Sequence, residues 1–406
     1  YFNRCDTLLG YSEYGIRTLS DQTQGRVCPV DIAPPGTDPS VFDIIPNKKE
    51  HKKSFGLPED SYIVGTVMRN QKRKMFPELM RGFKEFDKRT NKDCYLYLHT
   101  SYPEKMGWNI SSLVQDLDLG AKVLVTYICK SCKSYFVSHF KDAICKCEKC
   151  GQLAAVMPSV QLGLERKDLK NIYNLMDIYV QYAICEGFGM PQVEAAACGV
   201  PIAAINYSAM EDVLETVDGY KIEANLQREM ETNADRSFAN KEGLVNALLT
   251  HCKMHSDQSQ TKRLHTRKKC IEKYNWDNAC KAWQRVFDSV DLNKNMPWDS
   301  GPTIKPLPTE IPKNLNNEQF AQWIVLELIQ DNYHFGNYEM MNNIKSLNFG
   351  SKVEYGMLGN YNQESLFNEA KPVADRRYFF DSIRCGTQKI EPQPFAIEAR
   401  RRLKQS

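Results

Sequence analysis

The stretch EGFGMPQVEAAACGVP, residues 186–201, decides the fold class of this chain of 406 residues. It follows an apolar, β-rich run at Ile178–Tyr182 and leads into a second one at Val200–Ile205. Between these runs, Pro191 is suited to the first turn of a helix and Gly199 to the position just after its end. A strand, a helix and a strand in this order predict a parallel βαβ unit.

The same alternation extends outward from this unit. Strands that alternate with helices predict an α/β fold, a Rossmann-like parallel sheet with helices on both faces. The further elements that we predict are strands at Tyr62–Val67, Tyr95–Leu98 and Val123–Tyr127, helices at Phe76–Phe86, Lys167–Met176 and Pro191–Cys198, and two or three helices between Lys241 and Val290.

The turn at residues 186–191 carries groups suited to a charged ligand. Ligands of open α/β sheets bind outside the carboxyl ends of the strands. Gly187 and Gly189 let the backbone approach a ligand closely, and the helix that follows directs free N–H groups and a positive dipole end at a diphosphate. The carboxylates of Glu186 and Glu194 can face the same crevice. By pattern alone, a Rossmann loop with two solvated glutamates is an equal alternative.

A second polar turn, GTVMRNQKRK at residues 65–74, follows the first predicted strand and leads into a helix. Cations fixed here would stabilise the negative charge of a diphosphate. Arg69, Lys72, Arg73 and Lys74 compete for this role. Taken alone, this turn is more simply read as a solvated basic loop.

Taken together, the two turns resemble those of the retaining GT-B glycosyltransferases, the large glucosyl- and mannosyltransferase family called group 1. Residues 186–194 match its E-x7-E signature, and the basic turn matches its Arg-x4-Lys pair. The resemblance implies that Glu186 lies beside the transferred sugar, that Glu194 hydrogen-bonds the nucleotide ribose, and that no catalytic metal is needed. The site residues that it implies are Glu186, Arg69 and Lys74 for catalysis, and Gly187, Phe188, Gly189 and Glu194 for donor binding.

The resemblance covers about residues 1–290. Tyr11–Tyr14 and Pro35–Asp38 resemble the exit from the first of the family's two Rossmann domains, and Tyr274–Asp277 resembles the start of the helix that crosses back to it. The acceptor-binding first domain, which should precede Tyr1, is missing, so the activity of this chain alone is left open. The predicted parts are a remnant of, or linker from, that domain (1–40), the donor-binding half (41–290), a proline-rich linker (291–313) and a mostly helical accessory domain of unknown role (314–406).

An insertion at residues 129–151 predicts a zinc ribbon. Cys129 and Cys132 form one C-x2-C pair, and Cys147 and Cys150 form another after fourteen residues. Paired knuckles at this spacing are specific for a structural zinc ion held by four thiolates. The spare ligands are Cys145 and His139. Five lysines make nucleic-acid binding an alternative, but we favour packing or acceptor docking because nearby acids and the thiolates cancel most of that charge.

The composition limits the function classes. With 42% hydrophobic and 25% charged residues and a net charge of +3, the chain is typical of a packed globular protein and gives no charge argument for nucleic acid or membranes. No apolar run approaches the roughly 20 residues of a membrane span. The scattered cysteines suit a reduced compartment, so we expect a cytoplasmic protein. Asp116-Leu117-Asp118 spells a metal-binding D-x-D but fits a helix surface, and the basic run of residues 262–269 fits a solvated helix face.

The resemblance implies an enzyme that transfers a hexosyl group, with retention, from a UDP-, GDP- or ADP-linked sugar to an unknown glycan, protein or lipid acceptor. Two other classes stay open. One is a non-catalytic binding or structural protein in which the zinc ribbon acts on a Rossmann scaffold. The other is a phosphorylase or a sugar-nucleotide epimerase of the same fold, although the E-x7-E register speaks against the epimerase.

Overall fold

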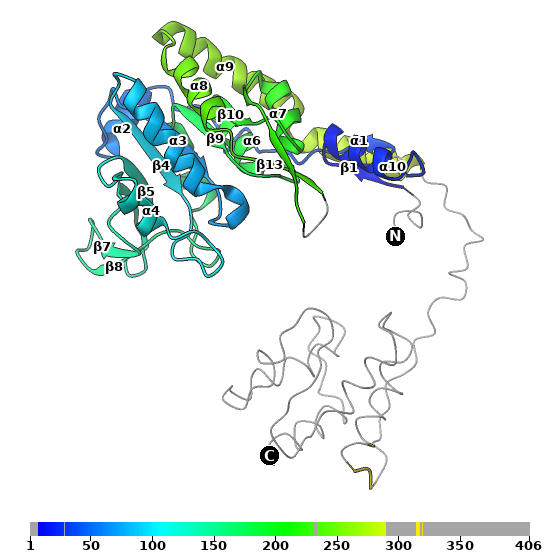
Figure 1. Cartoon of the computed structure of the whole chain (residues 1–406), viewed down its shortest axis with the longest axis horizontal. Coiled ribbons are helices and arrows are strands. Elements are labelled where there is room, and N and C mark those ends of the chain that lie inside the picture. Colours follow the sequence, from blue (N-terminus) through cyan, green and yellow to red (C-terminus); the bar gives the residue numbers. More distant parts are fainter. Residues whose placement is uncertain (1–6, 28, 231–233, 290–313, 317–318, 320–406) are drawn as a thin grey trace. The chain divides into compact units, whose positions relative to one another are not determined.

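The fold is taken from a computed structural model, which describes residues 7–27, 29–230, 234–289, 314–316 and 319. The chain divides into two units, residues 1–291 and 292–406. All helices and strands given below belong to the first unit (Figure 1). The predicted linker and most of the predicted accessory domain, including its expected helix at 320–328, lie outside the described residues.

A parallel sheet forms the centre of the first unit, as predicted. Its strand order is β11-β10-β9-β3-β4-β5, and all of these neighbours are parallel. The strands are β3 (Tyr62–Val67), β4 (Cys94–His99), β5 (Val123–Cys129), β9 (Ile178–Gln181), β10 (Ile202–Ile205) and β11 (Tyr220–Ile222). β3 and β4 pair in register from Tyr62 opposite Cys94 to Val67 opposite His99, so these strands end together at one edge.

Helices of two groups pack around the sheet. In one group, α3 contacts α4 and α8, and in the other, α6 contacts α5, α7 and α9. The apolar face of α3 explains its position, because the side chains of Phe76, Leu79, Phe83 and Phe86 are fully buried. The helices are α2 (Lys48–Ser54), α3 (Phe76–Arg89), α4 (Ile110–Asp116), α5 (Arg166–Leu175), α6 (Met190–Ala197), α7 (Ala209–Val217), α8 (Lys241–Cys252) and α9 (Ser256–Lys273).

An antiparallel extension continues the sheet beyond β5. β6 (Tyr135–His139) and β8 (Leu153–Val156) both pair with β5, and β7 (Ile144–Lys146) pairs with β8. Figure 1 shows β7 and β8 at one end of this unit. The insertion predicted at 129–151 therefore grows directly out of a Rossmann strand. A further antiparallel hairpin, β12 (Asn225–Arg228) with β13 (Asp235–Phe238), was not predicted from the sequence.

The first described residues and the last helix lie together at the other end (Figure 1). β1 (Leu9–Gly10) and β2 (Asp31–Ile32) form a two-stranded parallel sheet, with α1 (Glu13–Gln22) between them in the chain. α10 (Trp276–Ser289) contacts β2, and Arg285 forms an ion pair with Asp31 at 2.5 Å. This arrangement agrees with a crossing-back helix, while the predicted boundary at residue 40 stays a prediction.

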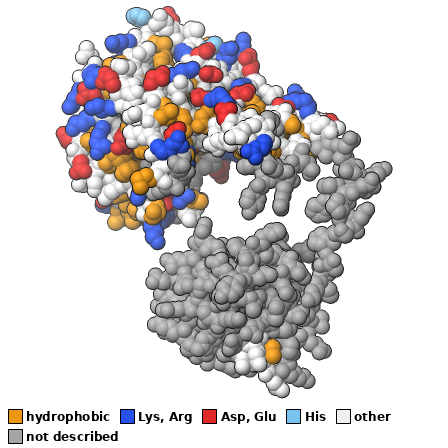
Figure 2. Space-filling view, turned by 45° about the vertical axis from the view of Figure 1, so that its right-hand side comes forward, with side chains coloured by type: hydrophobic (Ala, Val, Ile, Leu, Met, Phe, Trp, Pro, Cys, Tyr) orange, Lys and Arg blue, Asp and Glu red, His pale blue; other side chains and the backbone are white. Residues whose placement is uncertain are grey.

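The surface of this unit carries both signs of charge. On the face shown in Figure 2, basic and acidic side chains are interspersed, as expected for a nearly balanced chain. Among the described residues, no helix is long and apolar enough to cross a membrane.

Candidate functional site

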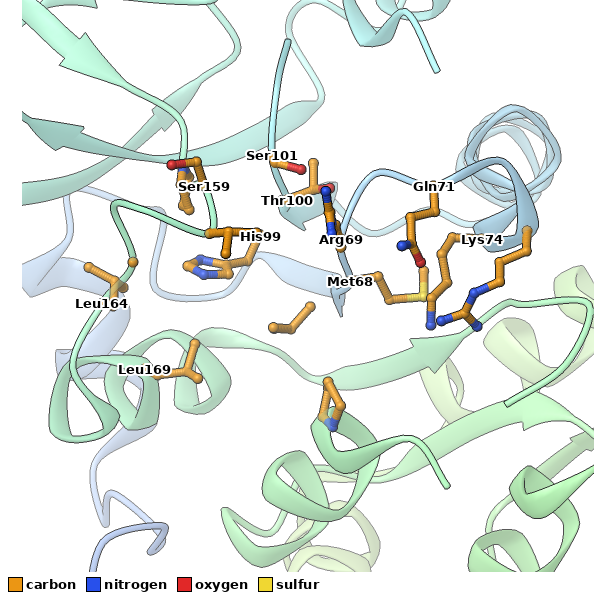
Figure 3. A pocket seen from close by; sticks show the side chains of 16 residues that line it. Met68, Arg69, Gln71, Lys74, His99, Thr100, Ser101, Ser159, Leu164 and Leu169 are labelled. Carbon is orange, nitrogen blue, oxygen red and sulfur yellow. The ribbon is translucent and has the colours of Figure 1, made fainter. Parts of the chain in front are cut away.

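A pocket of about 510 Å³ opens at the carboxyl ends of β3 and β4 (Figure 3). The residues after β3 supply one wall, the residues after β4 supply another, and Pro191 in the first turn of α6 also lines it. The pocket therefore lies where open α/β sheets bind their ligands. Its lining includes Met68, Arg69, Gln71, Arg73, Lys74, His99, Thr100, Ser101, Ser159, Leu164, Leu169 and Pro191.

Glu186 is the centre of a polar cluster beside this pocket: Arg73 and Lys74, which contact it, line the pocket, whereas Glu186 itself is not among the described lining residues. Its carboxylate forms an ion pair with Lys74, accepts a hydrogen bond from Arg73 at 3.1 Å, and accepts another from the Gln181 amide at 2.6 Å. Its backbone N–H donates to the Ser208 hydroxyl at 3.0 Å. The side chain is only 7% exposed. The basic turn and the E-x7-E turn, which are far apart in the sequence, therefore meet through their side chains.

The local backbone of the basic turn explains how Lys74 reaches Glu186. Residues Lys72–Lys74 form a single 3-10 turn after β3, and Met75 then adopts a left-handed conformation with φ of 39° before α3 begins. The turn directs Lys74 inward, where its side chain is 8% exposed. Burial and the neighbouring Arg73 guanidinium lower the pKa of Lys74 to about 7.

Of the two competitors of Lys74, Arg73 belongs to the cluster and Lys72 does not. Arg73 donates to the Cys185 carbonyl at 2.9 Å as well as to Glu186, and it lines the pocket. Lys72 is exposed, and it is not among the residues that line the pocket in the described part of the chain. The sequence alone could not rank these side chains because all three lie in one short turn.

Arg69 lines the pocket but pairs with a different carboxylate. Its guanidinium contacts both oxygens of Glu104, at 2.9 and 3.3 Å, and its side chain is 51% exposed. Glu104 also accepts from the Ser101 hydroxyl at 2.9 Å, which fixes it after β4. Arg69 and Lys74 thus both line the pocket, where Figure 3 labels them, but their side chains pair with different carboxylates.

The glycine turn that leads into α6 leaves room for a ligand. A Cβ at Gly187 would meet nothing within 4 Å, whereas Gly189 has φ of 86° and permits the sharp entry into the helix. The Phe188 side chain is not directed at this open space, because its ring packs edge-on against Tyr274 with the centroids 5.5 Å apart. Of this turn, the backbone and not the aromatic side chain is available to a ligand.

Glu194 lies one turn into α6 and is held by the hydroxyl of Tyr173, which donates to it at 2.7 Å. Burial raises the pKa of the Glu194 carboxyl. The structure describes no hydrogen bond between Glu194 and the Glu186 cluster in the residues that it covers. The two glutamates of the signature therefore have separate partners.

Two functional candidates at the end of β4 were missed from the sequence. His99 donates to or accepts from the Thr126 hydroxyl at 2.8 Å, and burial lowers its pKa to about 4, so it is neutral near pH 7. Ser101 contacts Glu104. The available signal was their position directly after the strand predicted at 95–98, since ligands of open α/β sheets bind outside the carboxyl ends of the strands.

The four predicted zinc ligands come together. The sulfurs of Cys129 and Cys150 are 3.7 Å apart, those of Cys132 and Cys147 are also 3.7 Å apart, and all four lie within 4.8 Å of one another. A tetrahedral zinc ion with bonds of about 2.3 Å requires sulfur separations of about 3.8 Å. Two of the sulfur separations match this value, and the others would have to shorten by no more than about 1 Å for the cluster to hold zinc.

The two cysteine knuckles also have the same backbone geometry. Lys133 and Gly151, the residues after each second cysteine, have φ of 59° and 71°. Their N–H groups donate to the carbonyls of Cys129 and Cys147 at 3.0 and 2.8 Å. Cys145 is buried outside this cluster. The sequence expectation of two equivalent knuckles is thus met in the fold.

Two further sequence expectations concern charged surface segments. Asp116 is the last residue of α4, and Asp118 follows the helix with φ of 49°, so only the first residue of this D-x-D lies on the expected helix. The basic run on α9 is only partly solvated, and that expectation was wrong for two residues. Arg263 is 6% exposed, and Arg267 donates to the backbone carbonyls of Phe42 and Pro39.

Comparison with known proteins agrees with this geometry. Residues 138–246 match the family model described as glycosyl transferases group 1. No curated protein matches the chain.

Among solved structures, sucrose-phosphate synthase from Thermosynechococcus elongatus is 17% identical with a TM-score of 0.50, over 71% of this chain and 60% of that one. Anabaena HepE in complex with UDP is 14% identical with a TM-score of 0.51, over 70% and 64%. HepE in complex with UDP-glucose is 14% identical with a TM-score of 0.50, over 71% and 65%. The chain spans less than two thirds of the length of each.

At these identities the structural likeness establishes the fold, and the matched segment contains the whole E-x7-E turn. Residues 138–246 are thus similar to group 1 glycosyltransferases, and the described fold agrees with the predicted second half of a GT-B fold.

Proposed function

We propose that this chain binds a nucleotide-diphosphate sugar in the pocket at the carboxyl ends of β3 and β4, and transfers its hexosyl group to an acceptor with retention at the anomeric carbon. The observation that carries this proposal is the meeting of Lys74 and Arg73 with Glu186 beside the first turn of α6. Cations and a helix N-terminus around one pocket, with a carboxylate bonded to two of the cations, suit a sugar diphosphate.

The diphosphate would lie between Lys74, Arg69 and the N-terminus of α6. As the bond from the anomeric carbon to the diphosphate oxygen breaks, both electrons go to the oxygen, and the fixed cations stabilise that charge. Because Lys74 is buried, water competes weakly for its ammonium group, which strengthens the interaction. No catalytic metal is required by this arrangement.

Glu186 would hold the sugar and stabilise the electron-poor anomeric centre. Its position is fixed by Lys74, Arg73 and Gln181, so that little reorganisation is needed when the donor arrives. Glu194, fixed by Tyr173, would accept hydrogen bonds from the ribose hydroxyls. The open space at Gly187 would admit the sugar close to the backbone.

Titration calorimetry of this chain with UDP-, GDP- and ADP-glucose tests the proposal. UDP-glucose is the first probe because HepE, of the same fold, is known in complex with it. We expect saturable binding of at least one of these donors, and its loss in Glu186→Ala. If no sugar nucleotide binds, or if binding persists unchanged in Glu186→Ala, the proposed donor site is wrong.

Turnover is a separate question because the chain spans less than two thirds of its structural relatives. The acceptor class, whether glycan, protein or lipid, would be screened with the donor that binds. Donor binding without hydrolysis or transfer in any longer form of the protein would favour the alternative of a non-catalytic protein. The stereochemistry is read from the anomeric proton coupling of the product.

The cysteine cluster is proposed to hold a structural zinc ion through Cys129, Cys132, Cys147 and Cys150. The matched knuckles and the sulfur separations support this. Because the first knuckle continues β5, the ion would also anchor the end of the central sheet. Elemental analysis should find one equivalent of zinc in the purified protein and much less in Cys147→Ser. Stoichiometric absence of zinc from freshly purified protein would exclude it.

The location of the protein and the role of its later residues are also proposals. We propose a cytoplasmic location, since the described cysteines form no disulfide. We also propose that residues beyond about 293 form an accessory part, because α10 closes the first unit at Ser289. A chain ending at Asn293 should then bind the donor with unchanged affinity, and loss of binding would make the later residues part of the site.

A further inference from the structure

A second pocket, of about 400 Å³, lies at the amino ends of the same strands. Tyr62 is the first residue of β3, Asp177 directly precedes β9, and Lys92 lies two residues before β4. The other wall comes from the start of α9, through Ser256, Ser259, Gln260 and Arg263. This basic pocket is therefore separated from the donor pocket by the length of the strands.

Part of the charge in the basic pocket is internally neutralised. Asp177 accepts from Lys52 at 2.7 Å, from Lys48 at 3.1 Å and from the backbone N–H of Ile63 at 2.7 Å. Lys49 pairs with Asp60 at the rim, at 2.7 Å. These groups satisfy one another and need no ligand.

Two cations of the pocket are left without a carboxylate. Among the described residues, neither Arg263 nor Lys92 forms an ion pair. Arg263 is 6% exposed, its Nε has no hydrogen-bond partner, and its guanidinium donates one long hydrogen bond, of 3.3 Å, to Gln260. Lys92 extends over the Tyr62 ring at 5.5 Å. A buried guanidinium with an unmade bond is costly, since buried polar groups are otherwise paired.

A buried histidine contributes a second unpartnered atom. His251 is 3% exposed, and its Nδ1 bonds the Tyr62 hydroxyl at 2.6 Å while its Nε2 has no partner. Burial lowers the pKa of His251 to about 4, so the ring is neutral. In the tautomer in which Tyr62 donates to Nδ1, the proton is on Nε2, which becomes a donor for an anion.

The first turn of α9 supplies further donors. This helix has 18 residues, and the hydroxyl-bearing Ser256 and Ser259 lie in its first turn. Helix N-termini favour anions through free N–H groups and the dipole. Arg263 and His251, each with an unpartnered nitrogen, thus line one cavity together with Lys92 and a helix N-terminus.

We propose that this pocket binds a phosphate group, as inorganic phosphate or as a small phosphate monoester, with Arg263, Lys92 and His251 as its ligands. The cavity is large enough for a monoester, and the guanidinium provides the paired N–H groups that phosphate accepts. This site is independent of the proposed donor site and requires no turnover.

The test measures thermal stability and calorimetric binding with inorganic phosphate and with glycerol 3-phosphate, against sodium chloride at equal ionic strength. UDP-glucose is present throughout so that the donor pocket is filled. We expect saturable binding of both probes and a rise in melting temperature. Lys92→Gln should weaken binding by about tenfold or more, as for loss of a charged hydrogen-bond partner. Lys72→Gln, a lysine at the other end of the strands that does not line the donor pocket, should leave it unchanged.

Gln260→Glu is the decisive variant because it changes one atom and places a carboxylate beside Arg263. We expect it to raise the melting temperature of the ligand-free protein and to abolish the effect of phosphate. Arg263→Gln is avoided as the main variant because the side chain is buried. A phosphate effect no larger than that of chloride overturns the proposal. So does binding that survives Gln260→Glu, or binding that falls as much in Lys72→Gln as in Lys92→Gln.

Discussion

The central strands carry a buried lysine–carboxylate cluster at each end, and the two clusters differ in how completely they are bonded. At the carboxyl ends, Lys74 has Glu186 as its one hydrogen-bond partner among the described residues, and it lines the donor pocket. At the amino ends, Lys52 donates to both the Ser61 carbonyl and Asp177. Asp177 in turn accepts from two lysines and a backbone N–H.

The comparison teaches that a shifted pKa does not by itself mark a functional lysine. Burial lowers the pKa of Lys48 to about 7, and burial lowers that of Lys74 to about the same value. Perturbed groups also occur in structural ion-pair networks. What separates the two is the remaining bonding capacity, since an ammonium group has three donors and Lys74 uses one within the described chain.

The largest effect is expected from opening the structural cluster. Asp177→Ala leaves Lys48 and Lys52 buried without their carboxylate, which should lower the free energy of unfolding by about 3–5 kcal/mol in urea denaturation. Asp60→Ala is the matched control, because its ion pair with Lys49 is exposed and should contribute no measurable stability. Equal losses in the two variants would remove the distinction between the clusters.

The functional cluster should respond in rate rather than in stability. Lys74→Ala should lower kcat by on the order of 10²-fold in a form of the protein that transfers sugar, as for loss of one transition-state partner. Its stability should fall less than that of Asp177→Ala, because Glu186 keeps Arg73 and Gln181 as partners. Lys72→Ala is the control in the same turn and should retain its rate. An unchanged rate for Lys74→Ala moves the role to Arg73.

The sequence predicted the described fold in more detail than it predicted the candidate donor site. Strand and helix positions followed from apolar runs with clear stops, as at Tyr62–Val67, where prediction and structure agree in both bounds. The hairpin of β12 and β13 was missed because its strands are polar and mostly exposed, without a period-2 apolar pattern. Cysteine spacing predicted the metal cluster because the ligands of each knuckle are local in the sequence.

Contacts between residues far apart in the sequence could not be predicted from such local patterns. The sequence indicated that Lys74 and Glu186 share a site, but not that they form an ion pair in the absence of a donor. Nor did it indicate that Asp177 and Lys52 form a cluster, since 125 residues separate them. Arg263 was taken as solvated because its neighbours in the run are charged, although its own face of α9 is buried.

Donor affinity should depend on pH through Lys74. In the free site its pKa is about 7, and a bound diphosphate would raise it, so binding takes up a proton above that pH. The affinity for the donor is therefore highest below about pH 7. Above that pH it falls by up to about tenfold per pH unit. Calorimetry with UDP-glucose between pH 6.5 and 8.5 measures this, in buffers of different ionisation enthalpy. Lys74→Gln should flatten the profile, whereas Lys48→Gln should not, because Lys48 lies at the other end of the strands.

The smallest effect is expected at Arg69, which forms an ion pair outside the two buried clusters. Its bonds to Glu104 are solvent-exposed, so breaking them should cost little stability. Glu104 nevertheless competes with a donor diphosphate for this guanidinium. Glu104→Gln removes the competing charge while Ser101 can still hold the side chain in place. We expect donor affinity to rise by about twofold to fivefold, the size of a weak surface pair, and to fall in Arg69→Ala. If Arg69→Ala binds the donor as well as the unchanged protein does, Arg69 is a surface residue bonded to Glu104, and the diphosphate depends on Lys74, Arg73 and the first turn of α6 alone.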